Sequence, residues 1–346
     1  MKSLVDCFSS QFFQKKTTAT SLLFFGLFLF TSFAVNATAN QSNSIILDTD
    51  ISSDVDDAGA VAVLHTLANQ DKVHILAMMV SSGDPWSGLC LDTLNDSFGR
   101  PGIPIGVIKH SAVTHVSKYT KYLAEHYRNT FSKNFEKPSA VELYREVLAS
   151  QPNDSITVVS VGYLSNLSRL LESGPDQYSP LNGKDLVTEK VKRLVCMGGE
   201  FPRGREWNIY QDAVAATIVV ADWPTPVIFC GFEIGSKIMT GKILNKAAEN
   251  HPLREAYRLY NNLTNRQSWD QATVLLAANL LDGTTPEKYL DISCPGKVLI
   301  DREGNTIWQA SQEGRHRFVI SNSKTKELAR IIDEMMLSAT LTHHPQ

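Results

Sequence analysis

The chain has 346 residues, of which 43% are hydrophobic and 20% are charged. These are the proportions of an ordinary globular protein, so they exclude a disordered, collagenous or coiled-coil chain. The 33 basic residues against 36 acidic residues give a net charge of −3. Because no long basic run is present to follow a phosphate backbone, nucleic acid is not expected as a partner.

The first 39 residues have the pattern of a signal peptide rather than of a folded domain. Lys2, Lys15 and Lys16 precede an apolar run at 21–35, and the segment ends in Ala-Thr-Ala39. We predict cleavage after Ala39, because the run is shorter than the roughly 20 residues that a membrane span needs. An uncleaved membrane anchor is the alternative.

The mature chain, residues 40–346, is then one exported domain without a membrane span. Removing three lysines and one aspartate leaves 30 basic and 35 acidic residues, so the mature protein is mildly acidic. We expect it in the periplasm or outside the cell. Asn166 begins an Asn-Leu-Ser triplet in the segment expected to form the site, so a bacterial setting without sugar attachment is favoured.

Short apolar runs alternate with helical patterns from residue 44 onward. The runs lack period-2 alternation, as expected for a parallel sheet that is covered on both faces. Helix-period patterns follow, with the clearest at 58–68, 141–148 and 213–221. The predicted fold is therefore α/β, a mostly parallel open sheet flanked by helices. The expected strands are 45–47, 73–80, 103–108, 156–161, 191–197 and 226–230.

Two further elements are expected near the C-terminus. Residues 240–282 have a purely helical pattern, and 296–308 reads as a hairpin that turns at Glu303-Gly-Asn. In open α/β sheets, ligands bind outside the carboxyl ends of the strands. The residues that follow each expected strand are therefore the candidates for a functional site.

Five aspartates follow or end the first expected strand, and they lead into a helix. Carboxylates this close repel one another unless a cation, helix amides or raised pKa values compensate. A solvated acidic loop is the alternative, but this loop follows a buried strand. A hard cation such as calcium or magnesium, which takes oxygen ligands, explains the cluster better. The five are Asp48, Asp50, Asp54, Asp56 and Asp57.

Two known types of site explain the aspartates incompletely. An EF-hand loop that starts at Asp48 needs Gly at its sixth position and Glu at its twelfth, where this chain has Ser53 and Gly59. A haloacid-dehalogenase-type phosphatase would use Asp48 as nucleophile and Asp50 as acid and base. That reading leaves the later aspartates unexplained, and no downstream lysine or acidic motif supports it.

The chain resembles the nucleoside hydrolase family, inosine-uridine preferring type, throughout its mature length. The family signature is D-T-D at a strand end followed by D-D-A at a helix start, which matches 48–50 and 56–58. Downstream, 162–167 resembles the family's G-P-L-T-N-L turn, and 206–212 resembles its E-F-N-x-x-x-D segment. Trp269-Asp270 resembles its late H-D pair.

This resemblance implies a Rossmann-like nucleoside hydrolase fold and a calcium-dependent (Ca²⁺) hydrolysis of N-ribosidic bonds in purine or pyrimidine salvage. Asp50 would be the catalytic base. The partners implied are a small nucleoside or riboside, with a homo-oligomer left open. The calcium ligands would be Asp50, Asp57, Asp270 and the carbonyl of Ser165, and the substrate contacts would be Asp56, Asp84, Glu206, Asn208, Trp86, Trp207 and Trp269.

The chain departs from the family pattern at three points. The loop before Asp56 is two residues longer and adds Asp54, so either carboxylate could contact ribose; we favour Asp56. Asp84 stands where the family usually has Asn. Trp269 replaces the family's His, so we expect the leaving base to be stacked rather than protonated by an imidazole. A non-catalytic, periplasmic riboside-binding protein is the alternative function.

Overall fold

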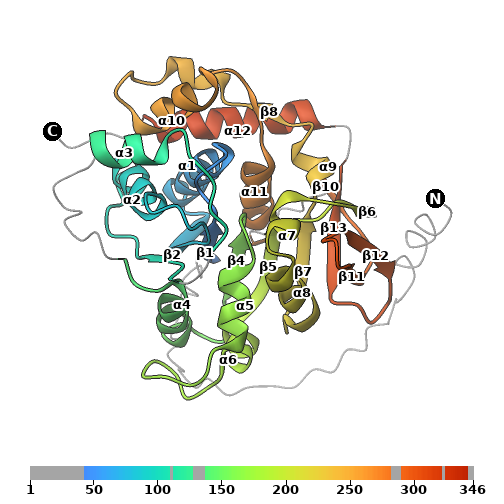
Figure 1. The fold of residues 1–346 in the computed structure, drawn as a ribbon. Coiled ribbons are helices and arrows are strands. Elements are labelled where there is room, and N and C mark those ends of the chain that lie inside the picture. The colour runs from blue at the N-terminus through green and yellow to red at the C-terminus, as the bar shows by residue number, and fades with distance from the viewer. Residues whose placement is uncertain (1–42, 110–111, 128–136, 282–289, 322–323, 342–346) are drawn as a thin grey trace, which may run out of the picture. The chain divides into compact units, whose positions relative to one another are not determined.

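The computed structural model describes residues 43–109, 112–127, 137–281, 290–321 and 324–341. Within them, the strands form a large mixed sheet with the order β3-β2-β1-β4-β5-β7-β13-β11-β12-β6, and β10 pairs with β13 (Figure 1). The pairs from β3 to β13 are parallel, whereas those from β13 to β6 are antiparallel. The strands are β1 (Asn43–Thr49), β2 (Val73–Val80), β3 (Ile105–Val107), β4 (Ile156–Ser160), β5 (Val191–Met197), β6 (Arg203–Gly204), β7 (Val227–Cys230), β10 (Leu290–Ile292), β11 (Gly296–Ile300), β12 (Thr306–Ala310) and β13 (His316–Ser321).

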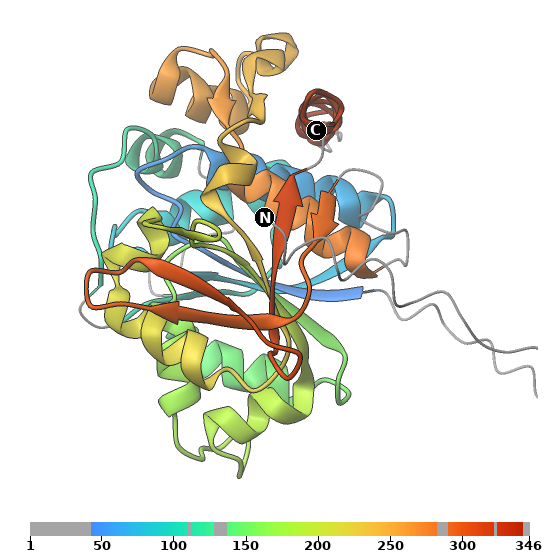
Figure 2. The ribbon, with the colours of Figure 1, turned by 90° about the vertical axis from the view of Figure 1, so that its right-hand side faces the viewer.

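Helices cover both faces of the sheet, as the uninterrupted apolar strands predicted (Figures 1 and 2). One hydrophobic core lies beneath α1, α2, α3, α10, α11 and α12, and a second beneath α4, α5, α6 and α8. The helices are α1 (Asp56–Asn69), α2 (Ser87–Ser97), α3 (Thr120–His126), α4 (Ala140–Ala149), α5 (Ser165–Glu172), α6 (Gly183–Lys190), α7 (Trp207–Gln211), α8 (Ala213–Asp222), α9 (Phe232–Gly235), α10 (Pro252–Asn261), α11 (Trp269–Leu281) and α12 (Thr325–Ala339).

All six expected strands are present, and two of them have the predicted bounds. The expected hairpin is also confirmed, because β11 and β12 pair antiparallel from Gly296↔Ala310 to Ile300↔Thr306. Gly304 in its turn has φ +78°, a conformation that favours glycine. In Figure 2 the orange-red hairpin lies on the side of the sheet that faces the viewer, next to β13.

The purely helical expectation for 240–282 is wrong. This stretch contains a 3-10 turn (Lys242–Lys246), and Thr240 pairs with Arg266 in a two-stranded sheet of β8 (Met239–Thr240) and β9 (Arg266–Gln267). Strands of two residues are too short to produce a detectable alternation. Residue 282 and the expected signal peptide lie outside the described residues. Among the helices that are described, none combines the length and the apolar character that crossing a membrane requires.

The strand order reverses direction next to β1, which has β2 on one side and β4 on the other. Such a switch point is where open α/β sheets bind ligands. Gly162, just after β4, allows the two loops there to meet: a Cβ at this position would lie 2.4 Å from the backbone nitrogen of Asp50. The fold therefore brings the end of β4 directly against the aspartate loop after β1.

Candidate active site

Asp48 belongs to the core rather than to a substrate site. Its carboxylate accepts hydrogen bonds from the Tyr144 hydroxyl at 3.0 Å and from Asn166 Nδ2 at 3.1 Å. Burial raises its pKa to about 7, although both hydrogen bonds lower it. It does not line the cavity described below, and a phosphatase nucleophile must reach its substrate. The geometry therefore argues against the phosphatase interpretation.

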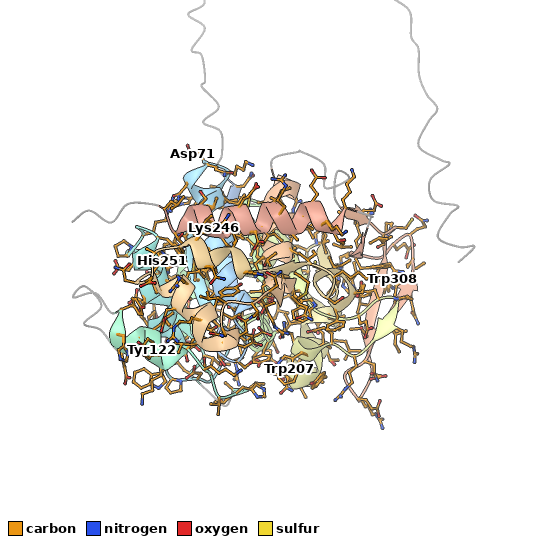
Figure 3. The ribbon with its side chains drawn as sticks, turned by 90° about the horizontal axis from the view of Figure 1, so that it is seen from above. Asp71, Tyr122, Trp207, Lys246, His251 and Trp308 are labelled. Atoms are coloured by element: carbon orange, nitrogen blue, oxygen red, sulfur yellow. The ribbon has the colours of Figure 1, made fainter. Side chains whose placement is uncertain are left out.

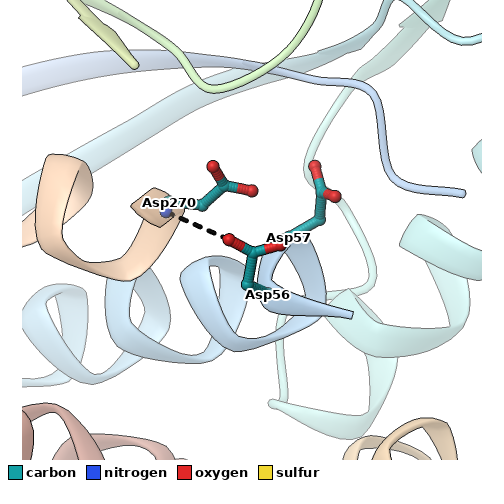
Figure 4. Close-up of side chains that lie close together, drawn as sticks. All are labelled: Asp56, Asp57 and Asp270. Atoms are coloured by element: carbon teal, nitrogen blue, oxygen red, sulfur yellow. Dashed lines mark hydrogen bonds between the residues drawn. The ribbon is translucent and has the colours of Figure 1, made fainter. Parts of the chain in front are cut away.

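Asp56, Asp57 and Asp270 form a compact carboxylate cluster, with one oxygen of each within 4.8 Å of the others (Figure 4). The first two start α1, and Asp270 lies in the first turn of α11. The helices approach closely because Gly59 of α1 has no side chain. A Cβ there would lie 2.4 Å from Nε2 of Gln271.

The electrostatics of this cluster fit a bound cation. Burial, followed by the negative charge of neighbouring aspartates, raises the pKa of Asp57 and Asp270 well above the usual value. Burial also raises the pKa of Asp56, and the charge of Asp54 raises it further. Oxygen ligands from carboxylates are the set that calcium or magnesium prefers. A divalent cation would offset the repulsion between these carboxylates, which contributes to their raised pKa values.

Asp50 lines the same cavity but is not part of the compact cluster. We expected Asp50 beside Asp57 and Asp270, and the structure has Asp56 there instead. Burial raises the Asp50 pKa to about 7, and a hydrogen bond from the Tyr163 hydroxyl opposes that rise. The Trp207 indole N–H points to the Tyr163 oxygen at 3.4 Å. Because that oxygen accepts from the indole, its own O–H is left to donate to Asp50.

The cavity has a volume of about 510 Å³, a size suited to a small ligand. It collects side chains that follow β1, β4 and β5 and that begin α7, α9 and α11. Eight of the eleven predicted site residues line it. Those eight are Asp50, Asp56, Asp57, Glu206, Trp207, Asn208, Trp269 and Asp270, and they are joined by Ser53, Asp54, His115, Val116, Val161, Met197, Phe232 and Arg266.

Three predicted site residues do not line the cavity. Asp84 accepts hydrogen bonds from the Thr120 hydroxyl at 2.6 Å and from the backbone N–H of Trp86 at 3.1 Å, so it orders the start of α2. The Trp86 ring packs instead beneath the Lys121 ammonium at 5.4 Å. Ser165 begins α5, and its hydroxyl donates to Asp212. Direct substrate contact by Asp84 and Trp86 is therefore not supported by this geometry.

Glu206 and Asn208 are placed by the start of α7. Glu206 caps this helix, accepting from the backbone N–H groups of Asn208 at 2.8 Å and Ile209 at 3.1 Å. Burial raises the Glu206 pKa to about 7 against these backbone hydrogen bonds. The Asn208 amide nitrogen donates to the Val161 carbonyl at 3.2 Å, so the amide oxygen of this cavity-lining residue is its acceptor for a ligand.

Two aromatic pairs form part of the cavity wall. The Trp207 ring, 43% exposed, packs against His115 with 5.0 Å between centroids. Trp269 stacks on Phe232 with 5.4 Å between centroids and 25° between planes. Figure 3 shows Trp207 well apart from Trp308, which belongs to the hairpin. No motif in the sequence pointed to His115, whereas Phe232 could have been found because it follows the end of β7.

Asp54 is held by an arginine from the segment expected to be helical. Arg266 Nε donates to Asp54 Oδ1 at 3.1 Å and to Oδ2 at 3.2 Å, and Nη2 also donates to Oδ2. Of the two carboxylates considered for ribose, Asp54 is therefore neutralised by an ion pair. Asp56 is buried beside Asp57 and Asp270, which supports the preference for Asp56.

Comparisons with known proteins agree with the sequence resemblance. The family model described as "Inosine-uridine preferring nucleoside hydrolase" matches residues 45–336. A pyrimidine-specific ribonucleoside hydrolase, RihA of Escherichia coli (strain SMS-3-5 / SECEC), is 34% identical over 104 residues, which span 29% of this chain and 30% of RihA. The chain thus matches about a third of the length of such curated relatives.

Solved structures match over most of the chain. A plant nucleoside hydrolase, the PpNRh1 enzyme, aligns with a TM-score of 0.64 at 18% identity and covers 86% of this chain and 99% of its own. A purine-preferring ribonucleoside hydrolase from Gardnerella vaginalis aligns with a TM-score of 0.64 at 15% identity, over 86% of this chain and 100% of its own. These likenesses establish the shared α/β fold.

Proposed function

The chain belongs to the inosine-uridine preferring nucleoside hydrolase family, and we propose that it hydrolyses the N-glycosidic bond of ribonucleosides or a related riboside to free base and ribose. The observation that carries this proposal is the single cavity that joins buried carboxylates to aromatic side chains. Carboxylates suit the hydroxyl groups of a sugar and the positive charge that develops on it, and aromatic rings suit a base.

A divalent cation, calcium in this proposal, would be held by Asp57 and Asp270 together with Asp56, the residues of the compact cluster. Asp50 and the backbone carbonyl of Ser165 are proposed as further ligands. When bound, such a cation acts as a Lewis acid toward water and offsets the negative charge of the cluster. The buried, mutually repelling carboxylates support this assignment.

Asp50 is the proposed general base. It would accept a proton from water as the water oxygen bonds to the anomeric carbon and the base departs with the electrons of the broken C–N bond. The Tyr163 hydroxyl holds the Asp50 carboxylate in place. Asp56 and the Asn208 oxygen would accept from the ribose hydroxyls, and the Glu206 carboxylate would stabilise the oxocarbenium-like transition state.

We also propose that residues 1–39 are a signal peptide and that the mature enzyme acts in the periplasm or outside the cell. The basic start, the apolar run at 21–35 and the Ala-Thr-Ala39 ending support export.

The deciding experiment measures ribose release by the mature protein from inosine, guanosine, adenosine, uridine, cytidine and p-nitrophenyl riboside. Each reaction is run with chelator and then with calcium restored. We expect release that chelator abolishes and calcium recovers. Riboside binding without any ribose release would instead identify a non-catalytic receptor and refute the proposed function.

A further inference from the structure

Arg266 brings a guanidinium group to a cavity otherwise dominated by carboxylates. It lies on β9, three residues before Trp269, and lines the cavity with a side chain that is 27% exposed. Its guanidinium carbon lies 5.1 Å from the centre of the Trp269 ring and 5.7 Å from that of Tyr260. Aromatic contact of this kind fixes the plane of the group.

The hydrogen bonds of Arg266 leave donors for a ligand. A guanidinium has five N–H groups. The Nε–H and one N–H of Nη2 are directed to Asp54, and one N–H of Nη1 is directed to Gln267 Oε1 at 2.7 Å. Two N–H groups, one on each terminal nitrogen, therefore have no protein partner among the described residues.

The charges around Arg266 select against an anionic ligand. Asp54 already balances its positive charge, and Arg266 is the one lysine or arginine among the described residues that line the cavity. Five other carboxylates line the same cavity, so a phosphate group would meet strong repulsion. The remaining donors therefore suit a neutral acceptor better than a phosphorylated one.

Building on the proposed function, we infer that Arg266 donates hydrogen bonds to the leaving base and thereby makes the enzyme prefer 6-oxopurine ribosides such as inosine and guanosine. A 6-oxopurine presents two neighbouring acceptors, O6 and N7, which match two N–H groups of a guanidinium. Adenine presents an amino donor beside N7, so it offers one acceptor and one repelling group. A pyrimidine lacks this pair of adjacent acceptors.

The same contact also assists bond breaking. As the C–N bond breaks, negative charge collects on the departing purine, including N7 and O6. Fixed donors near those atoms stabilise the charge and do not need to transfer a proton. Arg266 would thus support leaving-group departure in a cavity where Trp269 stands at the position of the usual histidine.

The test compares Arg266→Ala and Arg266→Lys with the wild-type mature protein in the presence of calcium. For each, kcat/KM is measured on inosine, guanosine, adenosine, uridine, inosine 5′-monophosphate and p-nitrophenyl riboside. We expect the wild type to prefer inosine and guanosine to adenosine. In Arg266→Ala, loss of the bidentate contact should lower the ratio of kcat/KM for inosine to kcat/KM for p-nitrophenyl riboside by about 5- to 150-fold. Arg266→Lys keeps a positive charge beside Asp54 but lacks the two parallel N–H donors of a guanidinium. Its ratio of kcat/KM for inosine to that for p-nitrophenyl riboside should therefore also fall.

Arg258→Ala is the matched control, because Arg258 pairs with Glu255 on α10 and does not line the cavity. Its substrate ratios should equal those of the wild type. Calorimetry with free hypoxanthine and adenine gives a second readout, in which Arg266→Ala should weaken only hypoxanthine binding.

Several outcomes overturn the inference while leaving the proposed function intact. An equal loss on all substrates would show that Arg266 only ties the Asp54 loop to β9. A wild type that cleaves p-nitrophenyl riboside but prefers adenosine or uridine would also refute it, as would faster turnover of inosine 5′-monophosphate than of inosine. If the wild type cleaves none of the ribosides, the proposed function itself fails.

Discussion

Asp270 donates its backbone N–H to Asp56 Oδ2 across 3.4 Å, and this contact joins the first turn of α11 to the first turn of α1 (Figure 4). The two residues are 214 positions apart in the sequence. The contact places two acidic helix starts side by side, an arrangement that costs stability unless the negative charge is compensated. Binding of a cation and stability of the fold should therefore be linked.

Asp57→Asn tests this linkage. In calcium, we expect the wild type to gain melting temperature, whereas the variant should bind calcium weakly and gain little. In chelator, the variant should melt at the same temperature as the wild type or higher, because one repelling charge is gone. Titration calorimetry and thermal melts measure both effects. Asp222→Asn, at an exposed residue paired with Lys184, is the control, and unchanged calcium affinity in Asp57→Asn would remove Asp57 from the ligand set.

Stability without metal should fall as the pH rises. Burial raises the pKa of Asp48, Asp50 and Glu206 to about 7 from ordinary values of 3.8, 3.8 and 4.5. The folded state therefore binds protons on these groups more tightly than the unfolded chain does. Their contribution to folding stability is full below about pH 4 and is lost as the pH rises through about 7. In chelator, the melting temperature should be lower at pH 8 than at pH 5.5, and Asp48→Asn should show a smaller difference. A melting temperature that is higher at pH 8 than at pH 5.5 would contradict this predicted pH dependence.

Much of the fold follows from patterns that strands and helices impose locally. The apolar strands and the Glu303-Gly-Asn turn have period and turn signals that can be read directly. β8 and β9 could not be predicted, because two-residue strands depend on contacts between segments distant in the sequence. Arg266 was missed for the same reason: its place in the cavity depends on the pairing of Thr240 with Arg266.

The site residues that directly follow strand ends could be predicted. Loop residues whose partners are set by tertiary contacts could not. Asp50 and Glu206 line the cavity as the motifs indicated. Asp84 also follows a strand, but Thr120 and the start of α2 capture its carboxylate. His115 lies on a long loop without a motif, and its packing against Trp207 depends on tertiary contacts.

Asp50→Ala tests the proposed base. We expect kcat to fall by several orders of magnitude, while riboside binding stays within about tenfold, because proton removal from water matters mainly in the transition state. Steady-state kinetics and equilibrium binding of inosine separate the two effects. Near-normal turnover would move the base to another carboxylate, with Asp54 the next candidate.

Gly162→Ala tests the close approach of the β4 loop to Asp50. The added Cβ would lie 2.4 Å from a backbone nitrogen, which cannot move aside as a side chain can. We expect a loss of about 1–3 kcal/mol in stability and, through displacement of Asp50, about a 10²-fold loss in kcat. Gly174→Ala is the control, because its Cβ would meet no atom within 4 Å. Equal behaviour of the two variants would contradict the prediction.

The last prediction concerns how the base leaves. Trp269 stacks on Phe232 where the family pattern has a histidine, so we expect no imidazole to protonate the base. General acid catalysis typically contributes about 10²- to 10⁴-fold, and its absence should be felt most by poor leaving groups. The p-nitrophenyl riboside should therefore be cleaved far faster than uridine, and Trp269→His should narrow the gap.

His115 supplies the sharpest control for this prediction, because it is an imidazole that lines the cavity. One ring nitrogen, Nε2, lies 3.2 Å from Gln211 Oε1, and the ring packs on Trp207. If His115 only supports Trp207, His115→Ala should resemble Trp207→Ala, with inosine hydrolysis reduced more than that of p-nitrophenyl riboside. A gap between uridine and the activated riboside that widens about 10²-fold in His115→Ala but not in Trp207→Ala would identify His115 as the general acid and refute the prediction.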